Sequence, residues 1–130
     1  MTATSTFALS TIGQIALTAG DVERAKRFYR DALGLPHLFD APPKMTFFDC
    51  AGIRLLLGES EDGTTKSTGS TIYFQVPDIA VAHEALRARG VEFIEPPHFL
   101  TRLPQGELWM AFFRDSEGNT LALQSIKPAP

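Results

Sequence analysis

The sequence predicts an α+β fold made of two βαβββ modules in tandem, whose sheets curl around a central cup. The chain repeats itself: when Gln14 is laid over Thr71, residues 14–22 match residues 71–79, and each copy is a strand-like alternation that runs into Asp and a β-branched residue. A helical period follows in both copies, and three strand-like segments follow each helical run. Internal repeats indicate duplicated structural units, so each copy is expected to fold as one module.

Each copy is expected to contain one helix, over residues 21–33 and 78–89. Apolar residues recur there at intervals of three and four, which is the helical period. Both runs begin with Asp, a favourable N-cap. Gly34 and Gly90 follow the two runs, where glycine favours the end of a helix.

Three strands are expected after each helix. In the first copy they span residues 35–39, 44–50 and 53–59, and in the second residues 91–94, 108–114 and 119–125. The glycine-containing segments 51–52 and 115–119 are predicted hairpin turns. The whole chain, 1–130, is therefore interpreted as a single domain with modules at about 9–60 and 69–126, joined by a polar loop over residues 61–68.

Composition excludes several classes of function. The 130 residues include 12 basic and 15 acidic side chains, for a net charge of −3, and 44% are hydrophobic. These values are typical of one globular domain. No basic block and no apolar run of about 20 residues is present, so neither nucleic acid nor a membrane is an expected partner. The N-terminus lacks the features of a signal peptide, so a cytoplasmic location is expected.

Alternation along the strands predicts which side chains face the helices. The apolar set on the helix side is Ile15, Leu17, Leu55, Leu57, Ile72, Phe74, Val76, Leu121 and Leu123. The set on the opposite, open side is Gln14, Ala16, Arg54, Leu56, Thr71, Tyr73, Gln75, Thr120, Ala122 and Gln124. An open face that mixes aromatic, amide and small side chains is the expected lining of a ligand-binding cup.

Two motifs resemble a known family. Residues 14–35 combine Gln-Ile-Ala-Leu, a helix with a Phe-Tyr pair and a Leu-Gly-Leu end, and residues 112–123 contain Phe-Phe-Arg-Asp-Ser-Glu-Gly-Asn. Together they resemble the glyoxalase, bleomycin-resistance and extradiol-dioxygenase group, the vicinal oxygen chelate superfamily. The resemblance implies two βαβββ modules around a cavity that binds a small molecule, usually within a homodimer.

The resemblance also implies where a metal ion would be bound in members that use one. Those ligands come from the first and last strands of each module, and the matching positions here are Gln14, Leu56, Thr71 and Ala122. Leu and Ala cannot coordinate a metal, a neutral Thr hydroxyl is a poor ligand, and only Gln14 is suitable. Cys50, the single cysteine, cannot build a Cys-based zinc site and is expected to be unreactive. No cofactor and no divalent metal are therefore expected.

Other ligand-binding candidates come from the second copy. The resemblance implies a loop over the cup in the second module, and His98, Arg102 and Glu107 are expected to bracket it. The resemblance also implies that Phe112 faces the cavity. Alternation then puts Met110 and Leu108 on the same side as expected pocket walls, and Trp109 and Phe113 in the core. His83 is expected to be a solvated helix residue.

Two hypotheses of different classes follow. The first is a protein that binds a small organic molecule in its cup without the metal, as bleomycin-resistance members do. The alternative is a lyase or isomerase of the glyoxalase type that uses Gln14 with His98, Arg102 and Glu107, with or without a recruited divalent metal. The sequence assigns no catalytic residue and does not identify the ligand.

Overall fold

The computed structural model describes residue 7 and residues 10–59 and 70–128. The loop expected at residues 61–68 lies outside the described residues. Within the described part, neither helix is long and apolar enough to cross a membrane.

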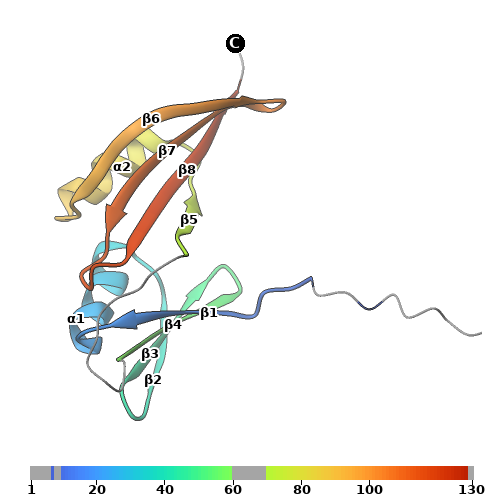
Figure 1. Cartoon of the computed structure of the whole chain (residues 1–130). Helices are drawn as coiled ribbons and strands as arrows, with labels where there is room; N and C mark the ends of the chain where they lie inside the picture. Colours follow the sequence, from blue (N-terminus) through green and yellow to red (C-terminus); the bar gives the residue numbers. More distant parts are fainter. Residues whose placement is uncertain (1–6, 8–9, 60–69, 129–130) are drawn as a thin grey trace, which may run out of the picture.

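The first module contains one helical segment and a four-stranded sheet (Figure 1). Its elements are β1 (Gln14–Ala19), α1 (Val22–Arg27), a π-helical turn η1 (Phe28–Ala32), β2 (His37–Ala41), β3 (Met45–Cys50) and β4 (Ile53–Glu59). The strand order is β1-β4-β3-β2, with β1 parallel to β4 and the other pairs antiparallel. Asp21 caps α1 by accepting the N–H groups of Glu23 and Arg24.

The second module repeats this arrangement. Its elements are β5 (Ile72–Gln75), α2 (Ile79–Ala88), β6 (Phe93–Leu103), β7 (Gly106–Arg114) and β8 (Thr120–Pro128), in the strand order β5-β8-β7-β6. Asp78 caps α2 by accepting the N–H groups of Ala80 and Val81. The two tandem βαβββ modules predicted from the repeat are therefore confirmed.

The predicted loop between His98 and Glu107 is wrong. Residues 93–103 form one long strand that pairs with β7 through a tight turn. The strand β6 contains Pro96-Pro97 and is the edge strand of its sheet, and an edge strand tolerates proline because one side of it needs no N–H donor. Three register irregularities accompany these prolines.

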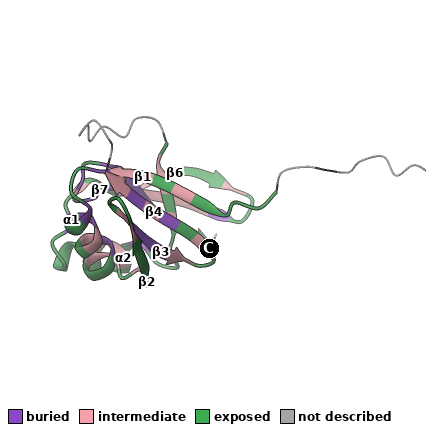
Figure 2. Ribbon diagram, turned by 90° about the horizontal axis from the view of Figure 1, so that it is seen from below, coloured by how far each residue is buried: buried purple, intermediate pink, exposed green. Residues whose placement is uncertain are grey.

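The core lies between the helices and the sheets. In Figure 1, α1 and α2 lie on the same side of the molecule. In Figure 2, buried residues lie along β3 and β4. All nine residues predicted to face the helices belong to this core or pack against it. Phe113 is fully buried as predicted, whereas Trp109 is half-buried. His83 is also half-buried, with its ring 4.4 Å from that of Phe93, rather than solvated.

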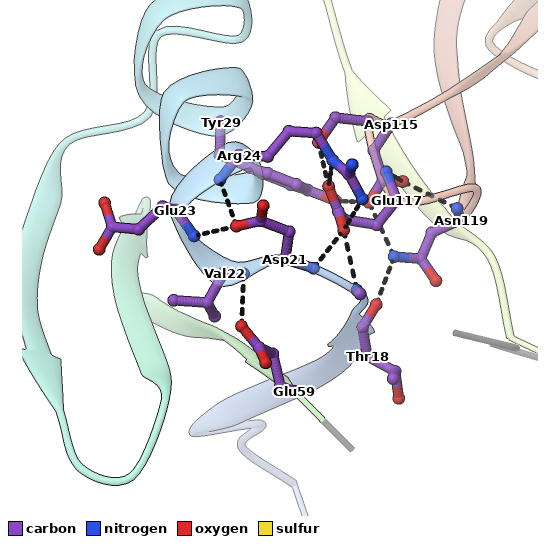
Figure 3. Close-up of polar contacts among 12 residues, drawn as sticks. Thr18, Asp21, Val22, Glu23, Arg24, Tyr29, Glu59, Asp115, Glu117 and Asn119 are labelled. Carbon is purple, nitrogen blue, oxygen red and sulfur yellow. Dashed lines mark hydrogen bonds and ion pairs between the residues drawn. The ribbon is translucent and has the colours of Figure 1, made fainter. Parts of the chain in front are cut away.

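The turn between β7 and β8 joins the two modules (Figure 3). The Glu117 carboxylate accepts hydrogen bonds from the backbone N–H groups of Gly20 and Asp21, both at 2.8 Å, and from the Arg24 guanidinium. The Asn119 amide donates to the Thr18 carbonyl at 3.0 Å. A turn of the second module thus completes the start of α1 in the first.

A buried tyrosine anchors the same turn. The Tyr29 hydroxyl donates to Asp115 Oδ2 at 2.7 Å, and Asp115 Oδ1 accepts the backbone N–H groups of Glu117 and Asn119. Tyr29 is fully buried. Burial and the Asp115 carboxylate raise the pKa of Tyr29 well above 10, so the hydroxyl stays protonated as a donor.

Candidate functional site

The open face of the second sheet holds most of the predicted ligand-binding residues. Strand register places Tyr73, Ala122 and Phe112 side by side in one row across β5, β8 and β7. The next row contains Gln75, Gln124, Met110 and His98. Because paired residues project to the same side of a sheet, these two rows form one surface.

The first row is aromatic. The rings of Tyr73 and Phe112 meet edge to face with centroids 6.0 Å apart. Ala122 lies between them in the register and is completely buried. The His98 ring extends this surface, because it stacks on Phe112 at 6.2 Å. Tyr73 keeps 44% of its surface exposed, so this ring is open to a ligand.

The second row supplies polar groups. The Gln124 amide nitrogen donates to Gln75 Oε1 at 2.9 Å. Within the described part of the chain, the Gln75 amide nitrogen and the Gln124 amide oxygen have no protein partner, so a donor and an acceptor remain for a ligand. His98 Nδ1 donates to the Pro96 carbonyl at 2.8 Å, which leaves Nε2 3.5 Å from a Glu95 carboxylate oxygen.

Arg102 and Glu107 do not join this surface. They pair with each other at 3.3 Å, and Glu107 also accepts a hydrogen bond from the indole N–H of Trp109 at 3.1 Å. Trp109 packs against the core on the helix side, and alternation along β7 puts Glu107 on that side as well. The expected grouping with His98 is therefore wrong: the irregularities in β6 turn Arg102 to the opposite face.

The first sheet carries the remaining candidates on its own open face. Gln14 pairs with Arg54, and Ala16 pairs with Leu56. The Arg54 guanidinium lies 6.0 Å from the centre of the Phe47 ring. A hollow of about 370 Å³ adjoins Ala16 and Leu56 and is bounded by Met45 and Glu59.

Sequence reasoning missed part of this surface. Phe47 stacks on Phe39 with centroids 4.5 Å apart, and both lie in the row of Leu56. Both Phe47 and Phe48 are buried, but alternation along residues 45–50 puts them on opposite faces of the sheet, and the sequence carries this signal. On the second sheet, the pairing of Gln75 with Gln124 puts Gln75 on the open face, where alternation predicted it.

The inherited metal positions do not fit a metal ion. Gln14 and Leu56 are diagonal neighbours in one sheet, and Thr71, just before β5, has the same relation to Ala122 in the other. Leu56 and Ala122 have no coordinating atom, and Ala122 is fully buried. Among the described residues, no group of three or more His, Cys, Asp or Glu side chains is arranged to hold a metal ion.

Comparison with known proteins agrees with this architecture. A solved lactoylglutathione lyase from Agrobacterium tumefaciens is 23% identical, with a TM-score of 0.69 over 90% of this chain and 94% of that one. A member of the glyoxalase/bleomycin resistance protein/dioxygenase superfamily from Sphaerobacter thermophilus is 26% identical, with a TM-score of 0.70 over 90% and 98%.

A curated relative and a family model match as well. The relative is the uncharacterized protein YetH of Bacillus subtilis (strain 168), 25% identical over 122 residues that cover 87% of this chain and 96% of YetH. The family model matches residues 11–123. The chain therefore belongs to the Glyoxalase/Bleomycin resistance protein/Dioxygenase superfamily.

Proposed function

We propose that this protein binds a small organic molecule on the open face of its second sheet, without a metal ion at Gln14, Leu56, Thr71 and Ala122. The observation that carries the proposal is the exposed aromatic surface of Tyr73, Phe112 and His98 beside two partly unpaired glutamine amides.

The chemistry of this surface favours a planar ligand with a polar edge. Aromatic rings bind planar groups by stacking and edge contacts. The free amide donor of Gln75 and the free acceptor of Gln124 can bind an amide or a similar group, and Met110 adds apolar contact area. The combination of apolar surface with a few polar groups is typical of small-molecule sites.

Binding of planar aromatic amides tests the proposal. Benzamide and nicotinamide are titrated against the ¹⁵N-labelled protein, and amide shifts along β5, β7 and β8 are expected to saturate. Tyr73→Leu and Phe112→Leu are expected to weaken this binding about three- to tenfold, because each removes one aromatic contact. Phe99→Leu is the matched control, since Phe99 is an exposed ring that pairs with Trp109 on the opposite face. Equal weakening in all three variants, or in none, contradicts the proposal.

Metal analysis tests the second half of the proposal. After dialysis, the protein is expected to retain no stoichiometric zinc, nickel, manganese or iron, because the four positions offer one amide and one hydroxyl and no anionic ligand. Thr71→His with Ala122→Glu is expected to create measurable zinc or nickel binding. Ala122→Glu places a carboxylate between the rings of Tyr73 and Phe112, so circular dichroism checks that the double variant keeps its fold. A tightly held ion coordinated by Gln14 in the unmodified protein contradicts this part.

The alternative of a lyase or isomerase drew on Gln14, His98, Arg102 and Glu107. Two of these four residues lie on the helix side of the second sheet, so they cannot act on a ligand at its open face. We therefore do not propose lyase or isomerase activity through these four residues.

A further inference from the structure

The N-termini of the two helices are equivalent places in the two modules, but their backbone donors are satisfied differently. At α1, the N–H of Asp21 donates to Glu117 at 2.8 Å, and the N–H of Val22 donates to Glu59 at 3.0 Å. Two carboxylates from other elements therefore complete this helix start, in addition to the Asp21 cap (Figure 3).

No such carboxylates reach the start of α2. Asp78 caps the helix, and its side chain accepts from Ala80 and Val81. Within residues 10–59 and 70–128, no acceptor is bonded to the N–H groups of Asp78 or Ile79. Helix starts leave such donors to be satisfied by side chains, water or ligands, and Ile79 is 1% exposed.

Ser125 stands where the first module has Glu59. The β1–β4 ladder ends with the pair of Ala19 and Glu59. The β5–β8 ladder ends one pair earlier, with Gln75 and Gln124, so the next residue, Ser125, occupies the position equivalent to Glu59. Ser125 is 1% exposed, and its buried hydroxyl has no hydrogen-bond partner in the described part of the chain. A buried polar group without a partner is destabilising and calls for an explanation.

A cavity of about 460 Å³ adjoins these groups. Residues 77–80 at the start of α2 form one wall, and residues 125–128 of β8 form the other. Lys127, on this second wall, holds its ammonium 3.9 Å from the centre of the Trp109 ring and makes no ion pair with another described residue. The cavity therefore lies beside two backbone donors at the positive end of a helix, beside the buried Ser125 hydroxyl, and beside a lysine that has no ion-pair partner among the described residues.

We propose that this cavity binds the carboxylate of a small molecule, which occupies the place that Glu59 and Glu117 hold in the first module. Its oxygens accept the N–H groups of Asp78 and Ile79 and the Ser125 hydroxyl, and Lys127 balances its charge. The Asp78 carboxylate does not exclude such a ligand, because Asp21 lies at the equivalent position beside two carboxylates. The cavity lies on the helix side of the sheet and is independent of the open face.

Sodium acetate is titrated against the ¹⁵N-labelled protein, and its binding is measured from the ¹⁵N–¹H signals of Asp78 and Ile79. A titration with sodium chloride at equal ionic strength is the comparison. Saturating shifts with acetate alone are expected. Linear shifts that sodium chloride reproduces overturn the proposal. Inorganic phosphate is titrated in parallel, and saturation by phosphate without saturation by acetate overturns the assignment to a carboxylate.

Two variants test the residues. Ser125→Glu supplies an internal carboxylate at the Glu59 position, so it is expected to abolish the acetate response. Lys127→Gln is expected to weaken acetate binding about two- to fivefold, and Lys44→Gln, a lysine beside the α1 cavity, is the matched control with no expected effect. If Ser125→Glu folds and its acetate binding is unchanged, the proposal is overturned. If Ser125→Glu does not fold, unchanged acetate binding in Lys127→Gln overturns it.

Discussion

Arg24 and Glu117 form a two-pronged ion pair across the junction of the two modules, with Nε–Oε2 at 2.7 Å and Nη2–Oε1 at 2.9 Å. The Glu117 side chain is completely buried, whereas half of the Arg24 side chain is exposed. Charged, two-pronged pairs are among the stronger hydrogen-bonded contacts in proteins. Since Glu117 also accepts two backbone N–H groups, its loss leaves several donors unpaired at once.

Glu117→Ala is expected to lower the free energy of unfolding by about 3 kcal/mol, because it strands part-buried donors that the carboxylate satisfied. Urea unfolding followed by circular dichroism measures the change. Glu84→Ala is the control, since its pair with Arg87 is largely exposed on both sides and such pairs contribute about 1 kcal/mol or less. Equal losses in the two variants contradict the role given to Glu117.

Stability is also expected to fall at acidic pH through Glu117. Burial by itself raises the pKa of this carboxyl, but hydrogen bonds from Arg24, Ser116 and the Asp21 backbone outweigh burial and lower the pKa to about 2, from an ordinary value of 4.5. Between these values the unfolded chain binds more protons than the folded one. The contribution is therefore complete above pH 4.5 and is lost as the pH falls toward about 2. Urea midpoints measured across this range should fall less steeply in Glu117→Gln than in the unmodified protein.

Tyr29→Phe is expected to cost about 1 to 2 kcal/mol of unfolding free energy, because it removes the buried hydrogen bond to Asp115 Oδ2 and leaves that oxygen with the Asn119 amide as its donor. Burial and Asp115 raise the pKa of Tyr29, so its phenolate should form only when the protein unfolds. The chain has two tyrosines, so the ultraviolet titration is read in Tyr73→Phe. Phenolate absorbance from the folded variant near pH 10 is the result that contradicts this expectation.

Gly106→Ala tests the tight turn that replaces the predicted loop. Gly106 has φ +144°, and an added Cβ would lie 2.1 Å from the Lys127 carbonyl oxygen. A loss of about 2 kcal/mol or more is expected, from backbone strain together with the clash. Gly118→Ala separates the two effects, because Gly118 has φ +85° with nothing within 4 Å of the added Cβ, and about 1 kcal/mol is expected there. Equal losses at the two sites exclude the clash as a cause.

Cys50 is expected to react slowly with thiol reagents at neutral pH. Burial and the neighbouring Asp49 carboxylate raise the pKa of its thiol, and the thiolate is the reactive form. The rate with Ellman's reagent should be several-fold below that of free cysteine and should rise with pH. The protein in 6 M guanidinium chloride, where the environment of Cys50 is lost, serves as the reference, and equal rates with and without denaturant contradict the expectation.

The modules could be predicted from the sequence because their signals are local. Asp21 and Asp78 mark two helix starts, and the helical period and the turn glycines repeat in both copies. Strict alternation along β5 and β8 placed Tyr73, Ala122 and Gln124 on the same face, as the register shows.

The predictions fail where alternation breaks or where contacts are distant in sequence. Strict alternation would put Arg102, four residues after His98, on the same face as His98. Three register irregularities in β6 break this alternation, so the face of Arg102 could not be predicted from the sequence. Glu117 was assigned only to a hairpin turn, because nothing near it in the sequence indicates that it meets Arg24. The sequence predicts only that Ser125 lies in a strand. Whether its buried hydroxyl finds a hydrogen-bond partner depends on contacts with another element, and in the described part of the chain it finds none.

The turn at residues 115–119 has a consequence for how the chain acquires its structure during synthesis. Its partners lie far back in the sequence: 96 residues separate Glu117 from Asp21, 86 separate Asp115 from Tyr29, and 101 separate Asn119 from Thr18. A ribosome must therefore have made residues 115–119 before the first helix can obtain its final hydrogen bonds. Until then, the Tyr29 hydroxyl lacks its acceptor, and burying it is unfavourable. The N-terminal half is thus expected to reach its native packing only after residues 115–119 have left the ribosome.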